Sequence, residues 1–204
     1  MAWLAGLLGP SGEVVDEVGT RADAAMDTQL RVLDKDPYLA VADSALRLIS
    51  VFDDLKYDRS DADMLSGPMR QRVVQALKPL GFVQRTGSMI ENREAGVRMH
   101  LPKSHALGAS PFDVTRYTAR QPQDYFILTP TQAAARIIDQ YDTDTAVERI
   151  KALIARQPIN LMRLVDHLER KDSHAAFGRA VGHLKYVQRE AVESDPLRTR
   201  RALR

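Results

Sequence analysis

The sequence predicts a mainly α-helical fold with a small β-hairpin. Three observations support this: apolar residues recur at helical spacing over most of the chain, proline and capping residues mark several helix starts, and strand-like alternation is confined to a central stretch. The chain has 204 residues, 44% of them hydrophobic, which is enough to form a real core. We therefore expect a winged-helix-like central region followed by a C-terminal helical bundle.

Four regions are expected along the chain. They are an N-terminal apolar segment with an acidic amphipathic helix (1–35), a winged-helix-like region with a long loop (36–128), a helical bundle (129–193) and a basic tail (194–204). The opening MAWLAGLLGP has no preceding basic residue and is too short to anchor the chain. We interpret it as a short packing helix, with a docking peptide as the alternative. No apolar run reaches bilayer-spanning length.

Two helices are expected before the polar stretch 58–63. Ser11 is a suitable N-cap for the first, over 12–34, and Asp36 followed by Pro37 marks the start of the second, which runs to about Tyr57. The apolar residues of the second helix recur at helical spacing: Leu39, Ala42, Leu46, Ile49 and Phe52.

A third helix is expected over 66–80, opened by Ser66, Gly67 and Pro68. From Gly81 the apolar period approaches two, which predicts strands over 82–85 and 97–101 joined by a long polar tip. Residues 102–123 are loop-like, and 124–128 is a short strand or buried connector.

The sharpest boundary in the sequence is at Thr129. Thr129 and Gln132 form a capping box with Pro130 at the first helical position, so a helix starts here. Further apolar faces over about 147–154, 161–168 and 173–192, with short connections between them, predict an antiparallel bundle.

The order helix, helix, hairpin across 38–101 is that of a winged helix. In that arrangement the third helix and the two strands share one core, made of Met69, Val73, Leu77, Phe82, Val97 and Met99. The opposite face of the helix would present Gln71, Gln75 and Lys78, flanked by Arg70 and Arg72.

These side chains are suited to nucleic acid, because glutamine can pair with an adenine edge and arginine with guanine or phosphate. The expected nucleic-acid-binding residues are Arg70, Gln71, Arg72, Gln75 and Lys78 on the helix, Arg85, Arg93 and Arg98 on the wing, and Arg198, Arg200 and Arg201 in the tail. The alternative is an ordinary solvated face, and Glu91 and Glu94 in the wing tip argue against tight DNA binding.

A second cluster interleaves cations with aromatic rings: Arg116, Tyr117, Arg120, Tyr125 and Phe126. Such surfaces stack on bases. The stronger interpretation is that Tyr125 and Phe126 pack inside the protein.

No catalytic residue, metal or cofactor is expected. The chain has no cysteine, its five histidines lack metal-ligand spacing, and no phosphate-binding or nucleophile motif is present. Asp53 and Asp54 are adjacent, so in a helix they would point in different directions. A cysteine-free chain fits a reducing, cytoplasmic setting.

Charge is distributed unevenly along the chain. Residues 1–65 carry 6 Lys/Arg against 13 Asp/Glu, a net of −7, whereas residues 66–204 carry 23 against 14, a net of +9. The basic part indicates a polyanion as partner. We therefore expect a DNA-binding winged-helix protein whose helical bundle forms a homodimer or binds a protein partner. The alternative is an accessory or scaffold subunit that uses its winged helix for protein contacts, with the acidic helix 12–34 facing the partner.

Overall fold

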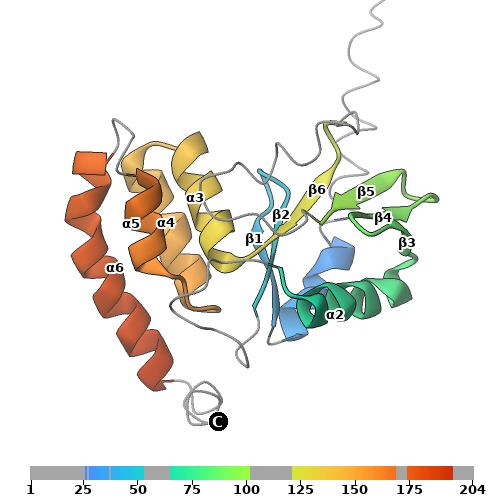
Figure 1. Ribbon diagram of the computed structural model, residues 1–204, viewed down its shortest axis with the longest axis horizontal. Helices are drawn as coiled ribbons and strands as arrows, with labels where there is room; N and C mark the ends of the chain where they lie inside the picture. The colour runs from blue at the N-terminus through green and yellow to red at the C-terminus, as the bar shows by residue number, and fades with distance from the viewer. Residues whose placement is uncertain are drawn as a thin grey trace, which may run out of the picture.

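The computed structural model describes residues 26, 28–36, 38–52, 65–101, 121–168 and 174–194 of the chain (Figure 1). Among these residues, no helix combines the length and the apolarity needed to cross a membrane. The expectations for MAWLAGLLGP, for residues 12–25 and for the basic tail fall outside the described residues.

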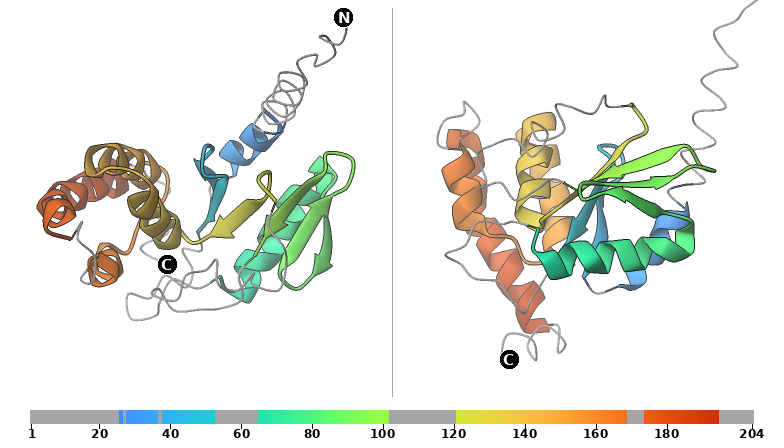
Figure 2. Two further views of the ribbon diagram at one scale, coloured as in Figure 1. Left: turned by 90° about the horizontal axis from the view of Figure 1, so that it is seen from above. Right: turned by 45° about the vertical axis from the view of Figure 1, so that its right-hand side comes forward.

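A six-stranded mixed sheet forms the centre of the molecule, so the expectation of a mainly α fold with a small hairpin is wrong (Figures 1 and 2). The strands are β1 (Leu39–Asp43), β2 (Leu48–Val51), β3 (Val83–Thr86), β4 (Met89–Asn92), β5 (Val97–His100) and β6 (Tyr125–Leu128). Their order in the sheet is β1-β2-β6-β5-β4-β3. β6 runs parallel to both of its neighbours, β2 and β5, and the remaining pairs are antiparallel.

In the described part of the helix predicted over 36–57, the antiparallel β1–β2 hairpin is present instead, whereas Asp53, Asp54 and residues 55–57 lie outside the described residues. All four residues of β2 are buried, so its apolar run continues through both faces of the strand. A short, fully buried strand does not show the alternation of a half-buried one, and its pattern can be mistaken for one face of a helix. The turn is stabilised by Asp43, whose Oδ1 accepts a hydrogen bond from the Leu46 N–H at 2.8 Å.

The predicted two-stranded wing is a three-stranded meander, because β4 lies within the stretch interpreted as its tip. The polar residue Asn92 occupies an inward position of β4, so the sequence did not show the apolar alternation that indicates a strand. Its side chain is buried but satisfied: Nδ2 donates to the Leu80 carbonyl at 2.9 Å, and Oδ1 accepts from the Ala95 N–H at 3.0 Å. Gly96 closes the β4–β5 turn with a φ of 65°, which favours glycine.

Helix α2 (Gly67–Leu77) continues into a 3-10 turn, η2 (Lys78–Leu80), and confirms the helix predicted over 66–80. Ser66 caps it, accepting a hydrogen bond from the Met69 N–H at 3.3 Å. The shared core predicted from the sequence is also observed, since one buried cluster contains Met69, Val73, Leu77, Phe82, Val97 and Met99. A helix followed directly by antiparallel strands that share its core is thus present, without the predicted helix at 36–57 before it.

Residues 26–35 belong to the same core. Residues 28–30 are helical, and the 3-10 helix η1 (Arg31–Lys35) follows. The side chains of Met26, Leu30 and Leu33 are at most 3% exposed and lie in the cluster that includes α2. This part of the predicted acidic helix therefore packs on its own chain.

The sheet separates two hydrophobic cores, and β6 contributes to both. Tyr125 and Ile127 face the cluster with α2, whereas Phe126 and Leu128 face the helices that follow β6. A strand buried on both faces is apolar throughout, which explains the run at 125–128.

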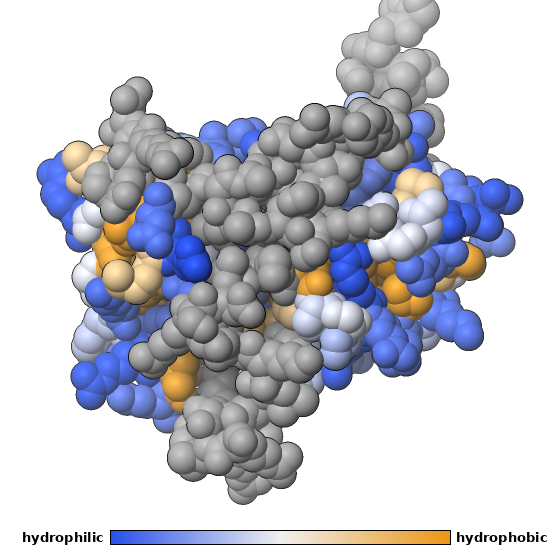
Figure 3. Space-filling view, viewed as in Figure 1, coloured by the Kyte–Doolittle hydropathy of each residue, from blue (hydrophilic) through white to orange (hydrophobic). Residues whose placement is uncertain are grey.

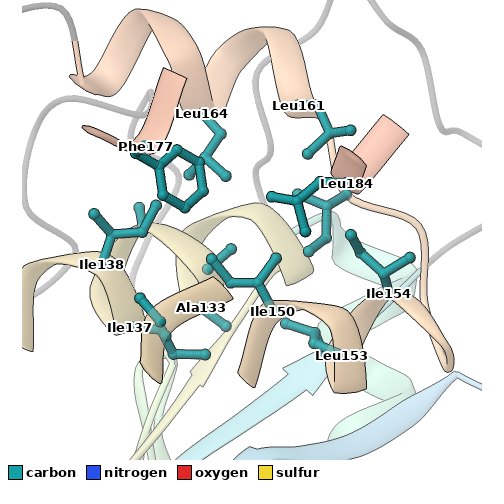
Figure 4. Close-up of a cluster of buried hydrophobic side chains, with 14 of the residues drawn as sticks. Ala133, Ile137, Ile138, Ile150, Leu153, Ile154, Leu161, Leu164, Phe177 and Leu184 are labelled. Atoms are coloured by element: carbon teal, nitrogen blue, oxygen red, sulfur yellow. The ribbon is translucent and has the colours of Figure 1, made fainter. Parts of the chain in front are cut away.

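Four helices lie where the sequence predicted helices after Thr129: α3 (Pro130–Gln140), α4 (Thr143–Ile154), α5 (Leu161–Leu168) and α6 (His174–Ser194). Thr129 and Gln132 form the predicted capping box. Figure 4 shows how apolar side chains from all four helices meet, including Ile137, Ile150, Leu164 and Phe177. Arg149 of α4 pairs with the buried carboxylate of Asp43 at 2.6 Å, which joins the bundle to the β1–β2 turn.

Candidate nucleic-acid interface

The outward face of α2 carries the side chains that the sequence assigned to it. Gln71, Gln75 and Lys78 are exposed, while Met69, Val73 and Leu77 on the opposite side are buried. In the view of Figure 3, the side of the molecule where α2 and β3–β5 lie is largely hydrophilic. The local cause is the helical period, which places residues three and four apart on one stripe.

Arg70 connects α2 to the meander. Its Nη1 donates a hydrogen bond of 2.8 Å to the carbonyl of Gly87, in the turn between β3 and β4. Partial burial lowers the pKa of Arg70, but an arginine remains charged at neutral pH. The helix and the β3–β4 turn therefore form one surface with a cation at their junction.

Arg72 is held by residues from the N-terminal part of the described chain. Its Nη2 lies 3.1 Å from Asp36 Oδ1, and its guanidinium stacks 4.0 Å from the centre of the Tyr38 ring. The ion pair offsets the charge of Arg72. This side chain therefore attaches α2 to Asp36 and Tyr38, and it is less suited to binding an anionic ligand.

Arg85 and Arg93 both bind the carboxylate of Glu91, at 2.9 and 3.2 Å. Their hydrogen bonds lower the pKa of Glu91. Two cations around one carboxylate leave a net positive charge, so the repulsion of phosphate expected from Glu91 is offset within the chain. All three groups are at the surface, where such pairs exchange readily with other partners.

Arg98 does not belong to the exposed surface. Its Nη2 donates to Asp124 Oδ2 at 2.7 Å, and the carboxylate of Asp124 is only 1% exposed. His100 Nε2 lies 2.9 Å from the same oxygen, and the backbone N–H of Gln121 donates to it at 2.9 Å. Arg98, which the sequence predicted to contact phosphate, instead forms an internal ion pair that joins β5 to the residues before β6.

Two residues of the second cluster, Tyr125 and Phe126, are among those that the structure describes. Tyr125 and Phe126 are 1% and 9% exposed, so these two rings pack inside, and Phe126 stacks on His100 with ring centres 5.3 Å apart. Arg116, Tyr117 and Arg120 fall outside the described residues, as do Arg198, Arg200 and Arg201. In the described part of the chain, no three His, Asp or Glu side chains come together as a metal site would require.

Asp124 should make the stability of the protein sensitive to acid. Burial raises the pKa of its carboxyl, but hydrogen bonds from Arg98, Gln121 and His100 outweigh that effect and the pKa is lowered. A lowered pKa means that this contribution is complete above the unfolded value of about 3.9 and is lost as pH falls through the folded value. The difference in free energy of unfolding between the wild type and Asp124→Asn, measured by urea titration, should shrink below about pH 4. A difference that grows on acidification would contradict this assignment.

The signal that sequence reasoning missed is a long stretch without acidic residues. From residue 65 to residue 90 there is no Asp or Glu, and there are four basic residues: Arg70, Arg72, Lys78 and Arg85. This stretch forms α2, η2 and β3. A count of charges over this window would have separated it from an ordinary solvated helix, which carries both signs.

Comparison with known proteins gives no relative: no family model, no curated protein and no solved structure matches the chain.

Proposed function

We propose that the chain binds double-stranded DNA, as a non-catalytic regulator or DNA-associated factor of the cytoplasm, with the bundle α3–α6 available for a homodimer or a protein partner. The observation that carries the proposal is the acid-free stretch 65–90, because it supplies every exposed side chain of α2 and leaves that face without a carboxylate of its own. Neutralisation of phosphates supplies most of the sequence-independent affinity for DNA, and it requires a surface without competing carboxylates.

The proposed surface is narrower than the set of residues that the sequence suggested. It consists of Arg70, Gln71, Gln75 and Lys78 on α2. Arg85 and Arg93 are left out, because they bind Glu91, which alternates with the core residue Ile90 along β4 and therefore lies on the sheet face turned away from α2. Arg72 and Arg98 are left out, because each is paired with a carboxylate of the chain itself. An exposed α-helix fits the width of the major groove, and the cations beside it are suited to the flanking phosphates.

The test is binding of the full-length protein to random-sequence duplex DNA across a salt series. The wild type should bind at low salt with an affinity that falls steeply as salt rises. The double variant Arg70→Ala/Lys78→Ala should bind about ten-fold more weakly at moderate salt, with a salt slope smaller by about two, since two phosphate contacts are lost.

A matched control is available on α6, where Arg179 and Lys185 are exposed. Arg179→Ala/Lys185→Ala removes the same charge from another part of the molecule and should leave the salt slope unchanged. If the folded Arg70→Ala/Lys78→Ala protein binds as tightly as the wild type, the assignment of this surface is wrong.

A second candidate function is a non-catalytic accessory or scaffold subunit of a larger complex. It is favoured by β3, an edge strand of the sheet whose four residues are all exposed, with Val83 at 53%. Exposed strand edges can pair with a strand of another chain. Folded protein that binds no duplex at low salt would favour this function, and its mass in solution would separate a homodimer from a monomer that requires a different partner.

A further inference from the structure

Two glutamines stand one helical turn apart on the exposed face of α2. Gln71 and Gln75 are four positions apart in the sequence, so they lie on one stripe of the helix. Within the described part of the chain, neither amide has a hydrogen-bond partner. Each therefore presents both a donor and an acceptor to a ligand.

The helix that carries them is fixed at two places. Ser66 caps its first turn, and Arg70 is hydrogen-bonded to the Gly87 carbonyl of the meander. Side chains on a rigid element are held at a constant separation, which recognition of a periodic ligand requires.

The separation between the two glutamines is comparable to the spacing between bases in a duplex. Four residues of α-helix advance by about 6 Å, and two steps between stacked bases advance by about 6.8 Å, at roughly 3.4 Å each. The groove winds around the axis, so its path from one base to the next is longer than this rise, and a helix lying in the major groove would place the two amides beside bases one or two steps apart. Glutamine pairs in two places with adenine, whose major-groove edge offers one acceptor and one donor.

The same surface is poorly suited to a single strand. Single-stranded nucleic acid is bound by stacking of bases on aromatic rings. Among the described residues, the exposed large hydrophobic side chains are Val32, Val83, Met162 and Tyr186, and the aromatic one, Tyr186, lies on α6. Tyr38, near α2, is covered by the guanidinium of Arg72.

We propose that Gln71 and Gln75 read two adenine bases, one or two steps apart, in the major groove of a duplex. This inference rests on the proposed DNA binding and adds a sequence preference to it. In this arrangement Arg70 and Lys78 contact phosphates and set the position of α2, while the two amides discriminate between bases.

The experiment is a selection of bound duplexes from a random-sequence library by the full-length protein, followed by titration of one enriched duplex. The selected sequences should contain two adenines at a fixed spacing of one or two steps. Replacing either adenine by guanine should weaken binding by about 5- to 100-fold. Gln71→Ala and Gln75→Ala should each remove the preference at one position and leave the salt slope unchanged. Gln140→Ala, at an exposed glutamine near the end of α3, is the matched control and should keep both preferences.

The outcomes separate this inference from the function on which it rests. If no duplex binds at low salt, the proposed function and the inference both fail. If duplexes bind without enrichment of adenines, or if the enrichment survives in Gln71→Ala/Gln75→Ala, the inference alone is overturned. Tighter binding of single strands than of duplexes would likewise overturn the inference.

Discussion

Asp124→Ala is expected to lower the free energy of unfolding by about 3 kcal/mol or more. The carboxylate is 1% exposed and accepts hydrogen bonds from Arg98 and from the Gln121 backbone, with His100 in contact. Its removal leaves the guanidinium of Arg98, which is only 17% exposed, without its counter-charge. Loss of one member of a buried ion pair is costly for this reason. Chemical denaturation followed by circular dichroism measures the change.

Asp166→Ala is the control for this prediction. Asp166 is an exposed carboxylate on α5, and surface substitutions of this kind change the free energy of unfolding by less than about 0.5 kcal/mol. If the two variants lose the same small amount of stability, Asp124 does not hold β5 to the residues before β6.

Leu30→Ala should also cost about 3 kcal/mol of unfolding free energy, within the usual range for a large core residue cut to alanine. The side chain of Leu30 is 0% exposed and lies in the core cluster with α2. The result matters for function, because the alternative interpretation of the sequence has the helix 12–34 facing a partner. A large loss of stability in the isolated protein would show that this segment is needed by the fold itself. Thermal and urea denaturation measure the loss.

Val32→Ala is the matched control, two residues away and 54% exposed. It should change the free energy of unfolding by less than about 0.5 kcal/mol. Equal effects of Leu30→Ala and Val32→Ala would mean that the segment is not packed as described. A truncation that tests a partner-binding role for the N-terminus should therefore stop before Met26.

The helices could be predicted from the sequence because their signals are local. Capping residues at Ser66 and Thr129 mark two helix starts, and apolar residues at helical spacing define the faces of α2 to α6. The core shared by α2 and the meander was also predicted, since the period changes from helical to alternating directly after Gly81.

The sheet could not be predicted in the same way, because its pairing is long-range. The β1–β2 segment has apolar spacing compatible with a helix, and its hairpin joins the rest of the sheet through the pairing of β2 with β6, which is about 80 residues away. β4 was not predicted because Glu91 and Asn92 make its sequence look like a polar turn. Both residues have partners in the folded chain, which allows them to lie in a strand. A mixed sheet of this kind depends on contacts that no short window contains.

The sequence predicted which side chains of α2 are exposed, but it did not predict which carboxylates pair with the arginines of the candidate site. The exposed face of α2 lies where the helical period places it. The pairing of Arg72 with Asp36 and of Arg98 with Asp124 joins residues 36 and 26 positions apart, so their neutralisation appeared only in the structure. A basic residue identified from sequence is therefore a candidate contact until its counter-ion is known.

The place of β6 in the middle of the sheet affects how the chain is made. β2 and β5 are each hydrogen-bonded to β6, so neither half of the sheet gains its central neighbour until residue 128 has left the ribosome. Pairings between residues so far apart close slowly, because the chain must lose the entropy of a long loop first. During that time β2 and β5 both have open edges, which is when strands of unfinished chains associate wrongly. We expect α3–α6, which follow β6 in the chain and have more local contacts, to form their helices quickly and to pack on the sheet once β6 has paired with β2 and β5.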